Sequence, residues 1–142
     1  MKIRLLMLGK TRRPEMRAVI EDYTKRISRS NPIETEEVRD GEAALKKLDG
    51  NRAAAAVLLD AGGKAYDAEA FAKWIGHQRD TGTRELIFVC GDADGFPNAL
   101  RERIRQKISL SPMTYSHELA RVMLAEQIYR AFAILSGSPY PR

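Results

Sequence analysis

The sequence lacks the groups of cysteines and histidines that disulfide-rich domains and zinc sites require. Its 142 residues include one cysteine, Cys90, and two histidines, His77 and His117. A single cysteine excludes an internal disulfide, and none of the three residues has a spacing typical of a zinc site. We therefore expect no structural metal. Cys90 ends an apolar run and has no basic neighbour in sequence, which favours an inert core thiol over a nucleophile.

Long apolar segments are missing as well. No run approaches membrane-spanning length, and the apolar stretch in residues 1–9 is not followed by a small-residue cleavage site. We therefore expect no membrane partner and a cytoplasmic location. A chain of this length is typical of one domain, here residues 1–142, that buries a core of its own.

Two common phosphate-binding motifs are also absent, because neither G-x-x-x-x-G-K-[ST] nor G-x-G-x-x-G occurs. The segment 91–95, Gly-Asp-Ala-Asp-Gly, resembles the start of a calcium loop. The twelfth position counted from Asp92 is Arg103, however, where calcium needs a bidentate glutamate. The sequence therefore disfavours both a P-loop and a calcium site.

Positive charge is concentrated at the two ends of this chain of net charge +5. Residues 1–30 hold nine Lys/Arg against three Asp/Glu, and residues 98–142 hold seven against three, whereas residues 31–97 hold eight against thirteen. If the ends meet in space, they form a basic patch suited to a polyanionic partner. Ordinary solvated helix faces explain the same pattern equally well, so charge leaves both interpretations open.

Short apolar runs predict the strands of a parallel sheet. Residues 55–59 and 86–90 are continuously apolar, and residues 3–8 are apolar apart from Arg4, as in strands that are covered on both faces. Residues 33–38 and 107–110 are more polar or shorter, and they suit edge or site-adjacent positions. Helical spacing of apolar residues lies between the runs, at residues 16–27, 43–48, 71–75 and 100–108.

The resulting order is strand then helix, five times. This order predicts an α/β fold with a mainly parallel sheet covered by helices on both faces. Ligands of such sheets bind beyond the carboxyl ends of the strands.

The last predicted helix has Ser116 as its N-cap and is apolar around most of its circumference. One sheet face cannot easily cover such a helix in a small domain, so a partner subunit is one expected cover. Central burial within one chain is the alternative. The apolar residues concerned are Leu119, Val122, Met123, Leu124, Ile128, Tyr129, Phe132, Ile134 and Leu135.

Three loops that follow strands, at 60–64, 91–95 and 111–116, are expected to open on one edge of the sheet. The glycines Gly62, Gly63, Gly91 and Gly95 would let backbone groups approach a ligand. The third loop is the richest, because hydroxyl groups alternate with apolar side chains from residue 109 to residue 116. That mixture suits a small ligand with both polar and flat apolar parts.

Three further residues of the last helix have open roles. His117 lies in its first turn and either serves the site or is a structural residue. Arg121 and Arg130 interrupt an otherwise apolar helix, where each either faces a phosphate or pairs with a glutamate such as Glu126.

These segments together resemble the small SPOUT-class RNA methyltransferases that methylate N3 of a pseudouridine in bacterial 23S ribosomal RNA. The resemblance covers nearly the whole chain and is most specific between residues 109 and 131. It is carried by Met1-Lys-Ile-Arg-Leu-Leu-Met-Leu-Gly9, Leu59-Asp-Ala-Gly-Gly-Lys64, Val89-Cys-Gly-Asp-Ala-Asp-Gly95, Leu110-Ser-Pro-Met-Thr-Tyr-Ser-His117, Arg121-Val122, Glu126-Gln-Ile-Tyr-Arg-Ala131 and Pro139-Tyr140.

The resemblance implies an α/β fold whose C-terminal part forms a trefoil knot, a homodimer, and S-adenosylmethionine (SAM) as cofactor. It also implies 23S rRNA within the ribosome as the partner and methylation of N3 of a pseudouridine as the reaction. The implied cofactor-binding residues are Leu59, Gly91, Leu110, Ser111, Pro112, Met113, Thr114 and Tyr115. The candidates for catalysis are His117, Tyr140 and Arg142, and those for RNA binding are Arg12, Arg13, Arg121 and Arg130.

The sequence departs from the family pattern in two places. Tyr140 is followed by Pro141 where the family usually has histidine, which leaves the group that removes the N3 proton open. Asp92 and Asp94 make the second loop more acidic than is usual. A non-catalytic RNA- or ribosome-binding protein with the same fold is therefore the alternative function. A nucleotide-binding or regulatory module that uses the acidic loop is the third interpretation.

Overall fold

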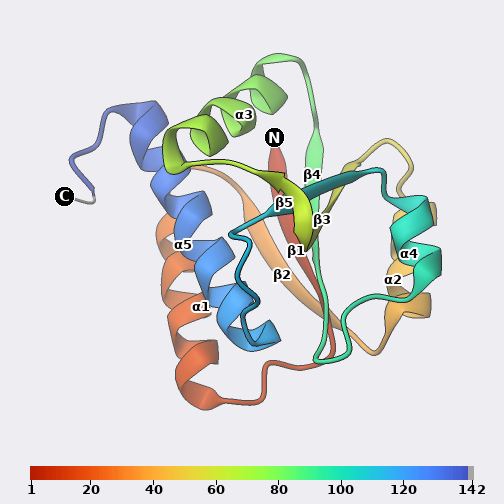
Figure 1. Cartoon of the computed structure of the whole chain (residues 1–142). Helices are drawn as coiled ribbons and strands as arrows, with labels where there is room; N and C mark the ends of the chain where they lie inside the picture. Colours follow the sequence, from red (N-terminus) through yellow and green to blue (C-terminus); the bar gives the residue numbers. More distant parts are fainter. Residues whose placement is uncertain (141–142) are drawn as a thin grey trace.

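The computed structural model describes residues 1–140, in which strands and helices alternate along the chain (Figure 1). This confirms the predicted order of five strand and helix units. The elements are β1 (Lys2–Leu8), α1 (Pro14–Ser28), β2 (Ile33–Val38), α2 (Gly41–Asp49), β3 (Ala55–Ala65), α3 (Ala68–Asp80), β4 (Glu85–Cys90), α4 (Asn98–Arg103), β5 (Gln106–Ser109) and α5 (His117–Ser136).

The strands form one sheet in the order β2-β1-β4-β3-β5, and every neighbouring pair is parallel. The two weaker predicted strands, β2 and β5, lie at the two edges, where less apolar sequences are tolerated. The more apolar strands β1, β4 and β3 lie in the middle of the sheet, where both faces are covered.

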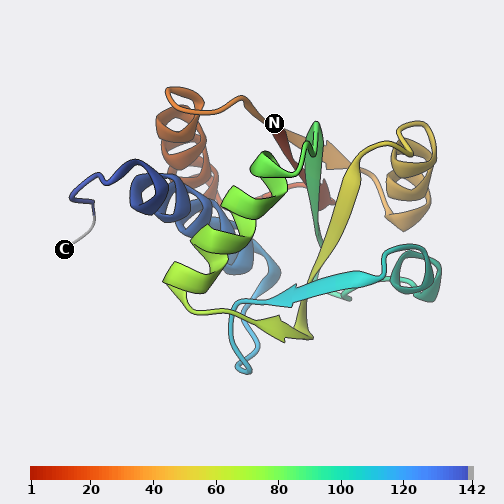
Figure 2. The same ribbon diagram turned by 90° about the horizontal axis from the view of Figure 1, so that it is seen from above.

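Helices cover both faces of the sheet, as Figure 2 shows from above. Helices α1, α3 and α5 lie on one face, over a core that includes Ile3, Phe88 and Ile128. Helices α2 and α4 lie on the other face, over a smaller core around Leu58 and Leu100. The predicted α/β class with helices on both faces is confirmed.

Two predicted boundaries are wrong. The segment 60–64 was expected to be a loop after a strand ending at residue 59, but β3 continues to Ala65. Its pairing with β5 resumes after a register shift between Leu59 and Lys64. The helical spacing of residues 100–108 is also misleading, because α4 ends at Arg103 and Ile108 belongs to β5. Both errors arise where chain segments far apart in sequence pair with each other.

Helix α5 is buried along its inner side, with Leu124, Ala125 and Ile128 fully covered by the rest of the chain. Leu119 and Ile134 on this helix remain more than a third exposed. Within residues 1–140, no helix is both long and apolar enough to cross a membrane.

Candidate functional site

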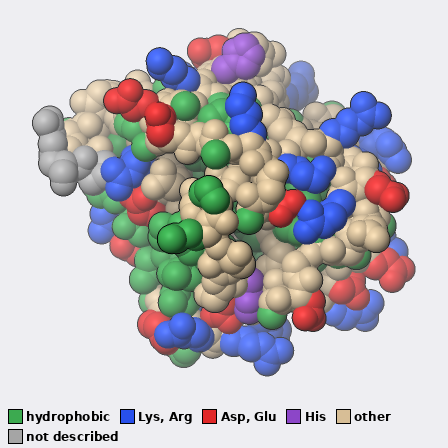
Figure 3. Space-filling model, in the orientation of Figure 1, with side chains coloured by type: hydrophobic (Ala, Val, Ile, Leu, Met, Phe, Trp, Pro, Cys, Tyr) green, Lys and Arg blue, Asp and Glu red, His purple; other side chains and the backbone are tan. Residues whose placement is uncertain are grey.

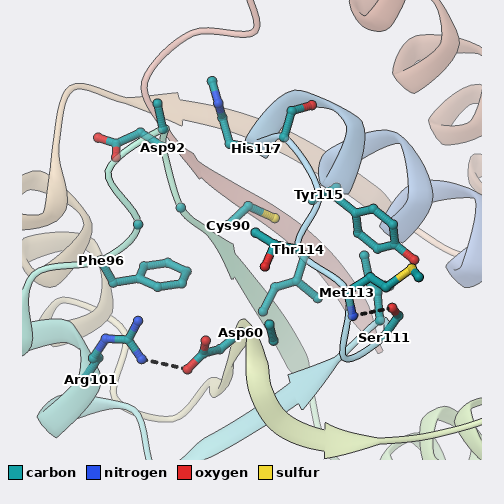
Figure 4. Close-up of a pocket in the computed structure, with 18 residues that line it drawn as sticks. Asp60, Cys90, Asp92, Phe96, Arg101, Ser111, Met113, Thr114, Tyr115 and His117 are labelled. Atoms are coloured by element: carbon teal, nitrogen blue, oxygen red, sulfur yellow. Dashed lines mark hydrogen bonds and ion pairs between the residues drawn. The ribbon is translucent and has the colours of Figure 1, made fainter.

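A cavity of about 400 Å³ opens beyond the carboxyl ends of the strands, next to the first turn of α5 (Figure 4). This is the edge at which the sequence predicted a site. Its size falls within the range of about 300 to 1,000 Å³ typical of small-molecule sites. It is lined by Leu59, Asp60, Ala61, Cys90, Gly91, Asp92, Ala93, Gly95, Phe96, Arg101, Leu110, Ser111, Met113, Thr114, Tyr115, Ser116, His117 and Ala120.

The loop between β5 and α5 forms one wall of the cavity. Six of its residues line the space, namely Leu110, Ser111, Met113, Thr114, Tyr115 and Ser116, whereas Pro112 is not among the described lining residues. Two hydrogen bonds brace the loop: the Ser109 hydroxyl donates to the Ser111 carbonyl at 2.8 Å, and the Met113 N–H donates to the Ser111 hydroxyl at 2.8 Å. The serines therefore shape the wall, while the Met113 side chain stays 75% exposed.

The loop after β4 forms the opposite wall. Gly91 and Gly95 approach each other so closely that a Cβ on Gly91 would lie 2.9 Å from the Gly95 carbonyl oxygen. The turn itself therefore requires glycine at position 91, independently of any ligand. The Asp92 carboxylate accepts the N–H of Asp94 at 2.8 Å, which stabilises the turn and explains one of the two acidic residues there.

The glycines that follow Leu59 have a different role from the predicted one. Gly62 and Gly63 do not appear among the described lining residues of the cavity. A Cβ on Gly63 would instead lie 2.6 Å from the Lys107 carbonyl carbon, so the missing side chain lets β3 pass β5. Leu59, just before this passage, does line the cavity.

Cys90 contributes to the inner end of the cavity and is 2% exposed. Burial raises the pKa of its thiol to about 12, although the charge of Arg121 opposes that shift. A thiol with such a pKa holds its proton at neutral pH and is a poor nucleophile. The preference for an inert thiol over a nucleophile agrees with this position.

The N-terminus of α5 brings polar groups to the cavity. The Ser116 hydroxyl accepts the N–H of Leu119 at 3.3 Å, which confirms the predicted N-cap. His117 lines the cavity one residue later, and its Nε2 lies 3.8 Å from Oε2 of Glu118. His117 therefore lies at the α5 end of the cavity with an acidic side chain beside it.

Glu118 holds the loop after β1 against α5. Its two carboxylate oxygens accept the backbone N–H groups of Arg12 and Arg13, each at 3.0 Å. Burial by itself raises the pKa of this carboxyl, but these two N–H groups, with His117 and Arg121 nearby, outweigh it and lower the pKa. The side chains of Arg12 and Arg13 stay exposed close to the His117 end of the cavity.

Arg121 is 1% exposed, and the structure corrects its predicted role in RNA binding. Its guanidinium donates to the Leu8 carbonyl, to the Gly9 carbonyl at 3.1 Å, to the Thr11 hydroxyl at 2.9 Å and to the Gly91 carbonyl at 3.4 Å. Its Nε has no hydrogen-bond partner among the described residues. The side chain therefore joins the ends of β1 and β4 to α5, and RNA has no access to it.

Tyr140 and Arg130 lie away from the cavity of the same chain. The Tyr140 hydroxyl donates to Glu126 at 3.0 Å, and its ring packs on Tyr129 with centroids 4.6 Å apart. Arg130 pairs with Glu126 at 2.8 Å. At 1.5 Å per residue, Glu126 and Tyr129 are roughly 14 and 18 Å along α5 from His117. One chain therefore does not bring the predicted catalytic residues His117 and Tyr140 together, and Arg142 lies outside the described residues.

Sequence reasoning missed three cavity residues, Phe96, Arg101 and Ala120. Asp60 belongs to the segment 60–64 that the sequence placed at this edge, although no role was assigned to its side chain. Phe96 and Arg101 lie on the approach to α4 and on α4 itself, so their place at the cavity depends on packing across the sheet. Within residues 1–140 there is no group of three or more His, Cys, Asp or Glu placed to hold a metal ion.

Comparison with known proteins agrees with this architecture. The family model described as "Predicted SPOUT methyltransferase" matches residues 1–141. The chain belongs to the SPOUT methyltransferase family. Curated relatives named ribosomal RNA large subunit methyltransferase H include one from Solibacter usitatus, 43% identical over the full length of both chains, and one from Pelobacter propionicus, 41% identical over 99% of each.

Solved structures share the SPOUT fold at low sequence identity. The tRNA (m1G37) methyltransferase of Aquifex aeolicus superposes with a TM-score of 0.63 at 12% identity, covering 100% of this chain and 75% of that one. A Legionella pneumophila protein solved in complex with the bound cofactor SAM gives a TM-score of 0.51 at 14% identity, covering 92% of this chain and 66% of that one.

Proposed function

We propose that this protein is a SAM-dependent methyltransferase that modifies N3 of a pseudouridine in 23S rRNA, with the assembled ribosome as substrate. One observation carries the proposal: residues 59–61 within β3 and the loops after β4 and β5 line a single cavity that also includes His117. The names of the relatives support ribosomal RNA as the substrate class. Such an enzyme would work in the cytoplasm.

The cavity fits SAM in size and chemistry. Leu59, Leu110 and Met113 supply apolar surface for a purine ring, and the backbone of the two loops supplies polar groups for its edge. We assign cofactor binding to the predicted set, with Pro112 supporting the loop from outside the cavity. When bound, SAM supplies an electrophilic methyl group on a sulfonium centre.

The chain's own residues mainly position the reactants and remove one proton. His117 is the proposed acceptor of the N3 proton, since it lines the cavity and faces the Glu118 carboxylate. Arg12 and Arg13, held by Glu118 near His117, are proposed to bind phosphates of the RNA backbone. Arg130 remains a candidate for a phosphate contact further along α5, although Glu126 competes for it.

A homodimer is part of the proposal. The exposed large apolar side chains among the described residues come from α1, the loop before α5 and α5, namely Val19, Met113, Leu119 and Ile134. Figure 3 shows hydrophobic side chains gathered over α5 and α1. The family resemblance implies that a second copy of this chain covers this surface. Light scattering on the wild type and on Leu119→Glu tests it, since the charged variant should shift toward the monomer.

The dimer also offers a role for Tyr140, which lies far from the cavity of its own chain. We propose that Tyr140 of one subunit serves the cavity of the other. Mixed dimers test this: subunits carrying His117→Asn, combined with subunits carrying Tyr140→Phe, should regain activity because one composite site is intact. Failure of the mixture, when each variant alone is impaired and dimeric, would contradict a shared site.

The C-terminal trefoil knot is likewise a proposal that rests on family membership. Mechanical extension of a single molecule from both ends would measure it. A knotted chain should stop short of the contour length of 142 residues, because some residues stay in the tightened knot.

The deciding experiment is the transfer of labelled methyl from SAM to ribosomes that lack the modification, followed by mass-spectrometric mapping. Label at a pseudouridine N3 of 23S rRNA is the expected result. Deproteinised RNA should be a poorer substrate, because a chain this small has little surface for reading RNA alone. Equal labelling of both would argue against recognition of the assembled ribosome.

The alternative function is a non-catalytic RNA- or ribosome-binding protein. It is favoured by the distance of Tyr140 from the cavity and by Pro141 in the position of the usual family histidine. RNA binding that falls steeply with salt, together with no methylated product, would support it.

A further inference from the structure

Asp60 and Arg101 form an ion pair inside the cavity. Nη1 of Arg101 lies 2.6 Å from Oδ2 of Asp60, at the side of the cavity away from His117 (Figure 4). The guanidinium also lies over the Phe96 ring, 5.7 Å from its centroid. The Asp60 side chain is 18% exposed and that of Arg101 is 40% exposed, so both groups can be reached from the cavity.

Few charged side chains line this cavity. Among its described lining residues, the carboxylates are Asp60 and Asp92, and Arg101 is the one lysine or arginine. Asp92 already accepts the N–H of Asp94 within its own turn. Asp60 and Arg101 thus present one negative and one positive group side by side to a ligand.

We propose that Asp60 and Arg101 bind the zwitterionic amino-acid head of SAM, with Asp60 taking the ammonium and Arg101 taking the carboxylate. This inference rests on the proposed function, because it needs SAM in the cavity. Each side chain exchanges one oppositely charged partner for another, so neither charge is left buried without a partner. Because the pair is partly exposed, separating Asp60 from Arg101 costs little free energy.

Phe96 is well placed to assist in this exchange. Its ring keeps the guanidinium over the cavity when Asp60 turns to the ammonium, since stacking on an aromatic face needs no counter-charge. Arginine also matches a carboxylate with two parallel donors. Arg101 and Asp60 would therefore recognise the amino-acid head of the ligand, while the loops after β4 and β5 recognise its adenosine part.

A purely structural role for the pair is the competing explanation, because it ties the bend in β3 to α4. Three ligands separate the two explanations: SAM, which carries ammonium and carboxylate; decarboxylated SAM, which keeps only the ammonium; and 5′-methylthioadenosine, which has neither. Their affinities for the full-length protein are measured by titration calorimetry, with no need for RNA or turnover.

The expected pattern is specific to each variant. Arg101→Gln should weaken SAM about tenfold or more and leave decarboxylated SAM and 5′-methylthioadenosine nearly unchanged. Asp60→Asn should weaken SAM and decarboxylated SAM, again without effect on 5′-methylthioadenosine. Arg103→Gln is the matched control on the same helix, because Arg103 pairs with Asp49 and does not line the cavity.

The contrary outcomes are equally clear. Equal weakening of all three ligands by both variants would overturn the proposal in favour of a structural joint. Unchanged SAM affinity in Arg101→Gln would overturn it directly. If the wild-type protein binds 5′-methylthioadenosine but not SAM, the head-binding assignment fails; if it binds none of the three, the cofactor in the proposed function fails as well.

Discussion

The guanidinium of Arg121 donates to the carbonyl oxygen of Gly9 at 3.1 Å, in the interior of the protein. The same side chain donates to the carbonyls of Leu8 and Gly91, so one residue of α5 satisfies backbone groups at the ends of two strands. Burial lowers the pKa of this guanidinium, although the surrounding acidic groups oppose the shift. The cavity wall at Gly91 is thereby held to α5.

Removing this side chain is predicted to destabilise the whole domain. In Arg121→Met, three backbone carbonyls and the Thr11 hydroxyl lose their donor, and buried unsatisfied groups cost about 1–3 kcal/mol each before relaxation. We expect the free energy of unfolding to fall by about 3 kcal/mol or more, as measured by urea denaturation. Arg79→Met, at an exposed site paired with Asp80, should change it by less than about 0.5 kcal/mol. If both variants lose an equally small amount of free energy of unfolding, Arg121 does not have this stabilising role.

Glu118 is predicted to make stability depend on acid pH. The pKa of its carboxyl is lowered from the ordinary value of 4.5, because the N–H groups of Arg13 and Arg12 outweigh the effect of burial. A lowered folded-state pKa contributes stability that is present above 4.5 and is lost as the pH falls through the folded-state pKa. Glu118→Gln should therefore be less stable than the wild type near neutral pH, and the difference should shrink on acidification.

Urea denaturation of both proteins between about pH 6 and about pH 3 measures this convergence. Glu102→Gln, which changes an exposed carboxylate on α4, is the matched control and should track the wild type throughout. Parallel curves for Glu118→Gln and wild type would show that Glu118 is not the titrating group.

Adjacent glycines in β3 are predicted to respond very differently to alanine. A Cβ on Gly63 would lie 2.6 Å from the Lys107 carbonyl carbon and 2.7 Å from the Ile108 nitrogen, and backbone atoms cannot move aside cheaply. Gly63→Ala should lower the free energy of unfolding by about 1–3 kcal/mol. Gly62→Ala meets nothing nearer than the Asp60 carboxylate at 4.0 Å, so it should be nearly neutral. Thermal unfolding of the two variants measures this difference. A similar loss of stability in both would contradict the close approach of the β3 and β5 backbones at Gly63.

The region of these glycines also shows why part of the fold could not be predicted from the sequence. The strands β1, β4 and the first half of β3 were predictable because burial on both faces leaves a run of mostly apolar residues. The extension of β3 to Ala65 was not, since its residues are polar or small and its pairing with β5 depends on a partner more than 40 positions away. Ile108 kept a helical spacing with Leu100 although it belongs to a strand, because spacing alone carries no information about long-range pairing.

The site was predictable where its residues end an apolar run or follow a strand. Leu59, Gly91 and the 110–115 loop lie at one edge for topological reasons that the strand order already contains. Arg121 was misassigned because a buried arginine that binds backbone carbonyls has the same sequence appearance as one that faces a phosphate. Arg101 was overlooked because helix α4 reaches the cavity only through its packing against β3 and α2.

His117 provides the sharpest test of chemistry at this site. If it accepts the N3 proton, His117→Asn should slow single-turnover methyl transfer to ribosomes by roughly 100-fold, the usual effect of losing a general base. SAM affinity should stay within about twofold of wild type, because His117 is not among the residues assigned to the cofactor. His77→Asn is the matched control, since His77 is exposed on α3 and distant in sequence from every cavity loop. An unchanged rate in His117→Asn would leave solvent or Tyr140 of the other subunit to remove the proton, and the mixed-dimer experiment would then choose between them.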